Sequence, residues 1–413
     1  MRKIMCFLLS LIIIMSGGVV AFAEDKKEEK IKDPTVEAAA AILMDAKTGR
    51  VLWEKDAYKP LAMASTTKIM TAVLALESGK QQETVTVSKA AAAAPRMKMH
   101  LTTGEKISLR NLLLALMLES SNDAAVAIAE HLAGSVEEFC AMMTNKAKEI
   151  GAKNTVFETP NGLDAGDHHS TAYDLAMIAR YALEVPGFIE LTNTETAKFS
   201  SNKREYSMVN KNRLLREYKG ANGVKTGFTN KAGHCFVGAA KRDDMQLISV
   251  VLASGWGDRG RQMKWVDTKA VLNYGFDNYA YEIIIHDEDL AGSTSVTRSR
   301  TSDMDFIYKS ELLLPLNQNK KEQIEVKLTV PDSIQAPITK GEIIGHAEIY
   351  VNGKLYASID LSATEEALRH DFKTSLEKVL NQWICQMTDE PVQLVLPEFP
   401  ELPNLPELPK FSG

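Results

Sequence analysis

Apolar residues near position 45 of this 413-residue chain follow a strand-like pattern, and those after position 60 follow a helical one. The segment AAAAILMDAKTGRVLWEKD has apolar runs on both sides of a central turn, which predicts a β-hairpin. Residues 61–79 have helical spacing. The segment ISLRNLLLALMLESSNDAAVAIAEHLAG predicts two more helical stretches, broken by a loop at ESSND.

The next part of the chain predicts further helices and then strands. We expect a helix near residues 135–150, a turn at TPNGLDAGDHH, and a helix opened by Thr171, with Asp174 three residues later as in a capping box. Residues 206–255 have a strand-like texture, and WVDTKAVLNYGFDNY predicts a last helix that closes this unit near residue 280. Helices between an early hairpin and late strands favour an α/β or α+β domain whose first and last strands share a sheet.

The pattern changes again after this unit. Short β-rich runs in residues 282–361 predict a small β-sandwich as a second domain. Residues 362–388 predict a strongly amphipathic helix. It either packs on the sandwich or lies in a membrane interface, with Trp383 at the lipid boundary. The helix has these apolar residues at three- and four-residue steps: Leu368, Phe372, Leu376, Val379, Leu380, Trp383, Ile384 and Met387.

The last residues, 389–413, form a proline-rich tail. Polyproline II has three residues per turn, so prolines at this spacing would form one edge and Leu and Phe side chains another. That apolar edge fits contact with a partner, the cell envelope or the protein's own domain, although an idle tail is an equal alternative. The prolines stand at every third position: Pro397, Pro400, Pro403, Pro406 and Pro409.

The N-terminus has the pattern of a secretory signal. Arg2 and Lys3 precede an apolar run, which ends in Ala-Phe-Ala before Glu24, so we expect cleavage after Ala23. The alternative is an uncleaved membrane anchor, since the apolar run is near the short limit for spanning. Either interpretation places the rest of the protein outside the cytoplasm. Residues 24–37 are rich in charge and predict a solvated linker.

Composition and charge narrow the class of protein. Hydrophobic residues make up 45% and charged residues 25%, as in soluble globular proteins. A net charge of -6 gives no electrostatic reason to expect a nucleic-acid partner. Beyond the signal, Cys140, Cys235 and Cys385 are odd in number and far apart, so a disulfide framework is not indicated.

The motif S-x-x-K, which can pair a serine nucleophile with a lysine base, occurs three times. In LAMASTTKIM, Ser65 and Lys68 share one face at the start of an apolar helix, where amide groups and the helix dipole favour developing negative charge. Ser200 lies in the polar stretch KFSSNKREY, and Ser375 lies on the terminal helix, away from other polar groups. Most isolated S-x-x-K motifs consist only of a helix-capping serine and a lysine whose stem lies along the surface. The surroundings of the three copies therefore decide, and they favour Ser65 as the nucleophile.

A lysine accepts a proton near neutral pH only where burial or a second cation disfavours its ammonium form. The chain offers a second cation and a relay hydroxyl. ESSND supplies Ser120 and Asn122, and GVKTGFT supplies Lys225, Thr226 and Gly227 in a predicted strand. Another KTG, at residues 47–49, is predicted to be a hairpin turn. The ordered set S-x-x-K, S-x-N and K-T-G is far more specific than any one motif.

This ordered set resembles the signature of penicillin-recognising serine enzymes. The segments MASTTKIMTA, ESSNDAAVAIAEHLAGS, TPNGLDAGDHHSTAYDLA and GVKTGFTNKAGHCFVGAAKR are similar to low-molecular-mass penicillin-binding proteins that are serine-type D-alanyl-D-alanine carboxypeptidases. The resemblance covers residues 36–386. It implies a transpeptidase/β-lactamase-like catalytic domain at 38–281, a β-rich domain at 282–361 and a helix at 362–388 that anchors the protein to a membrane surface.

The resemblance also implies roles for the residues that match. Ser65 would attack the carbonyl between two D-alanines and form an acyl-enzyme, with Lys68 as its base. Ser120 would relay the proton to the leaving D-alanine, and Asn122 would hold the substrate amide and orient Lys68. Water would then release the shortened peptide. Peptidoglycan stem peptides ending in D-Ala-D-Ala would be the substrates, and β-lactams would be acylating inhibitors.

The resemblance implies that the K-T-G motif on the predicted strand binds the substrate. Lys225 and Thr226, next to Gly227, would hold the terminal carboxylate, and the backbone N–H groups of Ser65 and Phe228 would form the oxyanion hole. The sequence departs from the family pattern at two positions. Ser121 stands where glycine is frequent, and Phe228 stands where histidine is common.

The family also tends to use a downstream cation for the carboxylate, and the sequence does not choose among Arg259, Arg261 and Lys264. No cofactor or metal is expected. A pair of adjacent histidines near Asp164 and Asp167 suggests a zinc site, but adjacent histidines rarely bind one ion, so we expect a loop there. These histidines are His168 and His169.

Three alternative functions remain. A β-lactamase would need a water-activating glutamate, for which Glu158 is the nearest candidate, although its surroundings resemble the carboxypeptidases. A D,D-endopeptidase that cuts peptide cross-links, or a silent wall-binding protein, would retain the same motifs. Roles in vegetative wall trimming and in spore-wall maturation would use the same residues.

Overall fold

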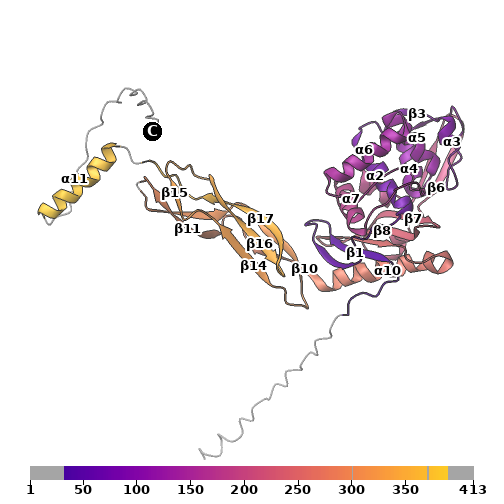
Figure 1. Cartoon of the computed structure of the whole chain (residues 1–413). Coiled ribbons are helices and arrows are strands. Elements are labelled where there is room, and N and C mark those ends of the chain that lie inside the picture. The colour runs from indigo at the N-terminus through magenta and orange to yellow at the C-terminus, as the bar shows by residue number, and fades with distance from the viewer. Residues whose placement is uncertain (1–31, 300, 370–371, 389–413) are drawn as a thin grey trace, which may run out of the picture. The chain divides into compact units, whose positions relative to one another are not determined.

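The computed structural model describes residues 32–299, 301–369 and 372–388 (Figure 1). The predicted signal at 1–23, most of the linker and the tail at 389–413 lie outside these residues. The catalytic part is built on a five-stranded sheet of order β2-β1-β9-β8-β7. Its strands are β1 (Ala40–Asp45), β2 (Val51–Lys55), β7 (Ala221–Thr229), β8 (Gly233–Arg242) and β9 (Met245–Leu252).

The early hairpin and the late strands meet as predicted. β1 pairs antiparallel with β9, from Ala40 opposite Leu252 to Asp45 opposite Leu247, and with β2 on its other side. All six residues of β1 are buried, because helices cover both faces of the sheet. β7 forms one edge of the sheet and carries the K-T-G motif.

Helices lie on both sides of this sheet (Figure 1). α10 (Gly257–Asn278) packs on β8 and β9 from one side, and the remaining large helices lie on the other. These are α2 (Lys68–Glu77), α4 (Leu109–Leu118), α5 (Asn122–Ala133), α6 (Val136–Glu149) and α7 (Ala172–Glu184). Smaller elements are η1 (Ala64–Thr67), β3 (Thr84–Thr86), α3 (Lys89–Ala92), β4 (Lys106–Ser108), α8 (Phe188–Asn193), β5 (Thr196–Ser200), β6 (Glu205–Val209) and α9 (Leu214–Glu217).

Local signals set the ends of these helices. Gly134, at φ 84°, ends α5 in the left-handed conformation that glycine adopts without strain. The Thr171 hydroxyl caps α7 by accepting the N–H of Asp174, as predicted. The Asp174 carboxylate does not complete a capping box; it accepts instead from the Thr155 hydroxyl at 2.8 Å and from the N–H of Asn154.

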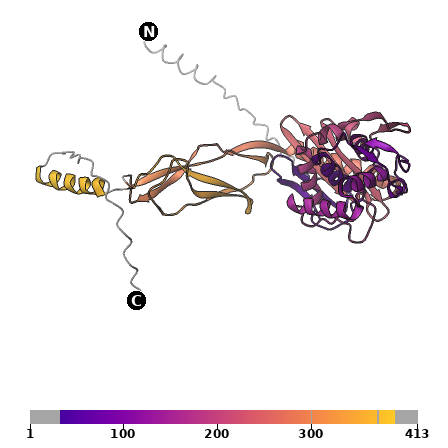
Figure 2. The same cartoon turned by 90° about the horizontal axis from the view of Figure 1, so that it is seen from above.

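A second body of β-structure follows, and its strands lie beside one another in orange in Figure 2. Its sheets have the orders β14-β16-β17-β12-β11-β15 and β10-β13, and residues from both share one apolar core, as expected for a small sandwich. Strand β10 crosses the boundary predicted between residues 281 and 282. The strands are β10 (Tyr279–Ile285), β11 (Leu290–Thr297), β12 (Asp303–Tyr308), β13 (Leu312–Asn317), β14 (Ile324–Thr329), β15 (Ser333–Gln335), β16 (Ile343–Val351) and β17 (Lys354–Ala363).

The terminal helix starts later than its apolar spacing predicts. α11 spans Phe372–Thr388, and the prediction that it begins at residue 362 is wrong. Ser362 and Ala363 still belong to β17, and Ala367 exchanges two backbone hydrogen bonds with Ile338, so pairing with neighbouring strands keeps this segment extended. Among the described residues no helix is both long enough and apolar enough to cross a bilayer.

Candidate active site

Ser65 lies in η1, the tight turn that leads into α2. The residue before it, Ala64, has φ 50°, so the backbone enters the turn in a conformation that costs energy for any residue except glycine. Two glycines press on this turn. A Cβ on Gly162 would lie 1.9 Å from the Ala64 carbonyl oxygen, and one on Gly227 would lie 3.0 Å from the Ser65 nitrogen. Glycine at both positions lets two other segments close around the serine.

Lys68 is fully buried beneath Ser65. Its Nζ donates to Ser65 Oγ at 2.9 Å, to Asn122 Oδ1 at 2.8 Å and to the backbone carbonyl oxygen of Asn161. All three acceptors are neutral. Burial, reinforced by the charge of Lys225, holds the pKa of Lys68 well below its usual range, although Asp123 opposes this shift. The amine can therefore exist without its extra proton while it touches the serine hydroxyl.

The S-x-N motif forms the break between α4 and α5, as the sequence predicts. Ser120 has φ 66°, and its buried hydroxyl has no hydrogen-bond partner among the described residues. Asn122 opens α5 and donates from Nδ2 to the Arg96 carbonyl at 2.6 Å, which orients its Oδ1 toward Lys68. A buried hydroxyl without a partner is costly, so the Ser120 hydroxyl has hydrogen-bonding capacity that the described residues leave unfilled.

The K-T-G motif lies on the edge strand β7. Lys225 is buried, and its Nζ donates to the Thr226 carbonyl at 3.1 Å. Burial lowers the pKa of Lys225 to about 7, and the charges of Lys211 and Lys264 act in the same direction. Phe228 is exposed at the end of the motif, and its ring stacks on His234 with centroids 4.4 Å apart. No direct hydrogen bond joins Thr226 or Phe228 to Ser65 among the described residues.

Two residues of this site were missed in the sequence. The Asn161 carbonyl accepts from both Lys68 and, at 3.3 Å, Ser65 Oγ. Because Asn161 contacts Lys68 and Ser65 through its backbone oxygen alone, the sequence signal is limited to the Asn-Gly pair that predicts a turn. Lys211 donates from Nζ to the Glu119 carbonyl at 3.1 Å, beside the S-x-N loop, and it stands in a polar stretch without a distinctive motif.

The other copies of the motifs lie elsewhere. Ser200 and Lys203 are exposed at the end of β5, and Lys203 Nζ donates to Thr102 Oγ1 at 2.9 Å. Ser375 and Lys378 are exposed on α11. Residues 47–49 form the predicted turn between β1 and β2.

The residues that suggested a β-lactamase or a zinc site in the sequence lie together in the loop before α7 and make contacts within it. The Glu158 carboxylate accepts the N–H of Asp167 at 3.0 Å. His168 and His169 lie in a loop before α7, and the described residues contain no group of three or more His, Cys, Asp or Glu that could hold a metal ion. Cys140 and Cys235 are both free and buried.

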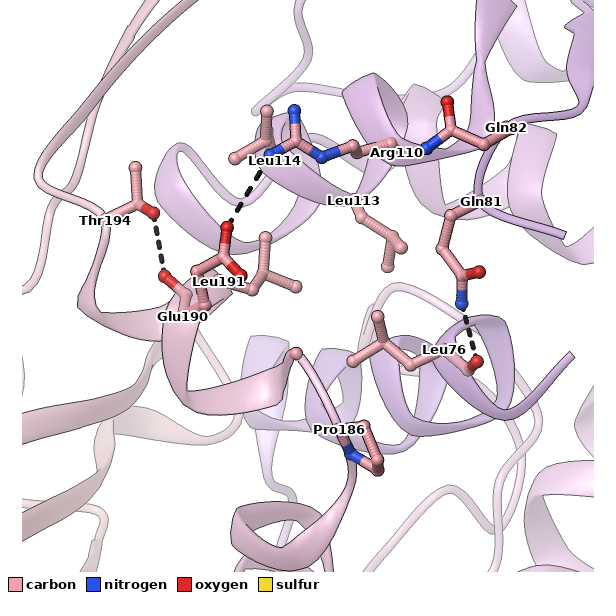
Figure 3. A pocket seen from close by; sticks show the side chains of 11 residues that line it. Leu76, Gln81, Gln82, Arg110, Leu113, Leu114, Pro186, Glu190, Leu191 and Thr194 are labelled. Carbon is pink, nitrogen blue, oxygen red and sulfur yellow. Dashed lines mark hydrogen bonds and ion pairs between the residues drawn. The ribbon is translucent and has the colours of Figure 1, made fainter. Parts of the chain in front are cut away.

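A hollow of about 390 Å³ lies apart from this chemistry (Figure 3). It opens between the C-terminal end of α2, the N-terminal end of α4 and the start of α8, whereas Lys68 and Ser120 lie at the other ends of the two longer helices. Leu76, Leu113 and Leu191 line its apolar part, and Arg110 pairs with Glu190 at 3.6 Å across it. None of the residues around Ser65 contributes to it.

Comparison with known proteins decides the family. Residues 27–255 match the family described as D-alanyl-D-alanine carboxypeptidase, peptidase S11, and residues 279–368 match the C-terminal domain of penicillin-binding protein 5. The chain belongs to the D-alanyl-D-alanine carboxypeptidase family. The predictions of a penicillin-recognising serine hydrolase and of a D-alanyl-D-alanine carboxypeptidase are therefore confirmed.

Individual relatives extend over most of the chain. It is 32% identical to the D-alanyl-D-alanine carboxypeptidase DacF of Bacillus subtilis, over 93% of this chain and 99% of that protein. It is 34% identical to DacC of Escherichia coli, over 79% of this chain and 83% of the relative. The crystal structure of penicillin binding protein 5 from Haemophilus influenzae superimposes with a TM-score of 0.70 at 28% identity, covering 82% of this chain and all of that one. Both parts of the fold are thus shared with family members.

Proposed function

We propose that Ser65 is the nucleophile with which this carboxypeptidase removes the terminal D-alanine from peptidoglycan stem peptides. Ser65 Oγ would attack the carbonyl carbon between the two D-alanines, expel free D-alanine and leave a serine ester, which water hydrolyses. The hydrogen bond of 2.9 Å between Lys68 Nζ and Ser65 Oγ, at a fully buried lysine, is the observation that carries this proposal. β-Lactams would acylate the same oxygen.

Lys68 is proposed as the base for this attack. A general base must reach the proton it removes and must be unprotonated at the working pH. Lys68 meets the first requirement through its contact with Ser65 and the second through burial beside a second lysine. Its other contacts, to Asn122 Oδ1 and the Asn161 carbonyl, hold the amine in place.

Ser120 is proposed to pass the proton to the leaving D-alanine nitrogen. Its buried hydroxyl has an unfilled hydrogen-bonding capacity, and Lys225 and Lys211 raise the positive potential of the surrounding loops. Asn122 is proposed to bind the substrate amide, since its side chain already links Arg96 O to Lys68. An incoming peptide would thus meet a fixed donor and acceptor.

The edge strand is proposed to bind the substrate backbone and its carboxylate. Gly227 lies so close to the Ser65 nitrogen that a side chain there would crowd it, which supports an oxyanion hole formed by the N–H groups of Ser65 and Phe228. Lys225 and Thr226 would hold the terminal carboxylate. Both N–H groups would then face the oxygen that gains charge during attack.

Lys264 is the best supported of the three candidate downstream cations. Arg259 pairs with Glu37, and Arg261 pairs with Asp258 at 3.6 Å. Lys264 is buried, has no ion pair among the described residues, and is the one of the three whose charge lowers the pKa of Lys225. It would add positive potential near the carboxylate site.

D-Alanine release from a pentapeptide ending in D-Ala-D-Ala tests the proposal. The parent is expected to release D-alanine, and Ser65→Ala is expected to abolish release while keeping its thermal unfolding temperature. A cross-linked peptide dimer in the same assay separates an endopeptidase from a carboxypeptidase. A folded parent that releases nothing from either substrate would point to a silent wall-binding protein.

We also propose that the protein is exported, loses residues 1–23 and associates with the outer face of the cytoplasmic membrane through α11. Val379 and Trp383 of this helix are exposed, at 49% and 62% of their full area, which fits insertion into a lipid interface. Co-sedimentation with anionic lipid vesicles is expected for the parent and to weaken in Trp383→Glu. Ser375→Glu, an exposed change on the same helix, adds the same charge as a control, and equal loss in both variants would contradict insertion of the apolar face.

A further inference from the structure

His168 lies under the turn that carries the proposed nucleophile, although nothing in the three motifs accounts for it. It is only 4% exposed, in the loop between α6 and α7. Its Nδ1 accepts the backbone N–H of Glu158 at 3.0 Å. A neutral imidazole carries a single proton, so the hydrogen must be on Nε2.

With the hydrogen on Nε2, His168, Thr67 and Ala64 form a chain of hydrogen bonds in which each group donates to the next. His168 Nε2 lies 2.9 Å from Thr67 Oγ1, and Thr67 Oγ1 donates to the Ala64 carbonyl at 2.8 Å. The Thr67 hydroxyl has a single hydrogen, which it gives to Ala64, so it must accept from His168. The chain therefore starts at the histidine and ends on the carbonyl group immediately before Ser65.

This carbonyl belongs to the strained part of the turn. Ala64 has φ 50°, a conformation that persists only where its surroundings enforce it. The Thr67 hydroxyl holds the Ala64 oxygen from one direction, and the backbone at Gly162 closes against it from another. A shift of this peptide would move Ser65 relative to Lys68.

The surroundings of His168 keep its ring neutral. Burial lowers the pKa of His168 to about 4, and the charges of His169, Lys231 and Lys68 act in the same direction. The ring also has the edge of Phe157 beside it, with centroids 6.0 Å apart. A neutral ring preserves the acceptor at Nδ1 and the donor at Nε2 that the chain requires.

We propose that His168 is a positioning residue, which acts through Thr67 and Ala64 to hold Ser65 in reach of Lys68. This inference rests on the proposed role of Ser65. It predicts that breaking the chain slows acylation rather than weakening the first encounter with the substrate. A misplacement of about 1 Å at a reacting group can cost about 100-fold in rate.

Acylation of the full chain by a fluorescent penicillin tests this, because the rate constant and the binding constant of the step are measured separately. His168→Leu and Thr67→Val are each expected to slow acylation by at least about tenfold, with little change in binding. His168→Gln is expected to restore most of the rate, since a carboxamide offers one acceptor and one donor. The double variant His168→Leu/Thr67→Val should be no slower than either single variant, because both break one chain.

Thr155→Val is the matched control. Thr155 is a buried threonine in the same loop region, and its hydroxyl bonds Ser170 and Asp174 rather than the nucleophile turn. It should lower the unfolding temperature without slowing acylation of the folded protein. Equal acylation rates in the parent, His168→Leu and Thr67→Val would overturn the inference alone. A parent that is not labelled at Ser65, judged against Ser65→Ala, would overturn the proposed function and this inference with it.

Discussion

The motif at Ser65 and Lys68 and the motif at Ser200 and Lys203 have the same spacing but lie in opposite environments. Lys68 is fully buried, with three neutral acceptors around its nitrogen. Lys203 is exposed and donates to Thr102 and to the Thr103 carbonyl on the surface. The spacing brings the serine oxygen and the lysine together only where a helix follows the serine. Burial, supplied by residues far away in sequence, gives the first pair its chemistry.

Removing each lysine gives the largest predicted difference between the two regions. Lys68→Ala should slow acylation of Ser65 by at least about 100-fold, since general bases contribute about 10²- to 10⁴-fold. Lys203→Ala should leave the acylation rate unchanged, because its amine touches only surface groups. The measurement is the time course of fluorescent penicillin labelling, with thermal unfolding as a check on folding. Slow labelling in both variants, or in neither, would remove the distinction drawn between the two motifs.

The sequence predicts the parts of the fold and site that depend on local pattern. The alternation before residue 56 predicts the hairpin, and helical spacing predicts α2, α4 and α5 with a break at ESSND. Pairing of β1 with β9 follows from the order of helices and strands. The start of α11 was placed too early because side-chain spacing does not show that Ser362 and Ala363 are held in a strand by distant partners.

The sequence also finds the side chains that act through their own functional groups, but it misses contacts made by the backbone. Ser65, Lys68 and Asn122 meet in space as the ordered motifs suggest. The Asn161 carbonyl, which touches both Ser65 and Lys68, has no residue-type signal, because any amino acid supplies a carbonyl. The histidine pair at 168 and 169 suggests a metal by composition, whereas both ring nitrogens of His168 are engaged in hydrogen bonds with Thr67 and Glu158.

Each of the two S-x-x-K motifs has a glycine with positive φ nearby, Gly162 beside the Ser65 turn and Gly104 beside the contact of Lys203. Gly162 has φ 84°, and a Cβ there would lie 1.9 Å from the Ala64 carbonyl oxygen. Gly104 has φ 75°, and a Cβ there would meet nothing within 4 Å; it follows Thr103, whose carbonyl accepts from Lys203. Alanine at either position carries the cost of a positive φ, about 1 kcal/mol or more. Only Gly162→Ala adds a collision with the nucleophile turn.

Gly162→Ala is therefore expected to lower the unfolding temperature further than Gly104→Ala and to slow penicillin labelling as well. Gly104→Ala should be labelled at the parent rate. The two variants are compared by thermal unfolding and by labelling under identical conditions. A normal labelling rate in folded Gly162→Ala would show that the turn does not need this close approach.

The last prediction is a change of stability with pH that arises from the buried lysine region. Lys225 has a pKa of about 7 in the folded protein, and an unfolded lysine has a pKa of about 10.4. Between these values the unfolded chain binds more protons at this residue, so stability must rise with pH, by up to about 1.4 kcal/mol per pH unit. Below pH 7 both states hold the proton, and the cost of burying the charge is present in full.

Lys225→Met removes this group, whereas Lys203→Met removes an exposed lysine as a matched control. The free energy of unfolding is measured in urea by tryptophan fluorescence from pH 7 to pH 9.5, and each variant is subtracted from the parent. Lys68 and Lys264 remain in every protein, but besides burial the charge of Lys225 also lowers the pKa of Lys68, so the difference from Lys225→Met reports Lys225 together with its effect on Lys68. The parent should gain stability over Lys225→Met as pH rises but not over Lys203→Met. Parallel curves for parent and Lys225→Met would mean that Lys225 is charged in the folded state, leaving Lys68 next to a permanent cation throughout this pH range.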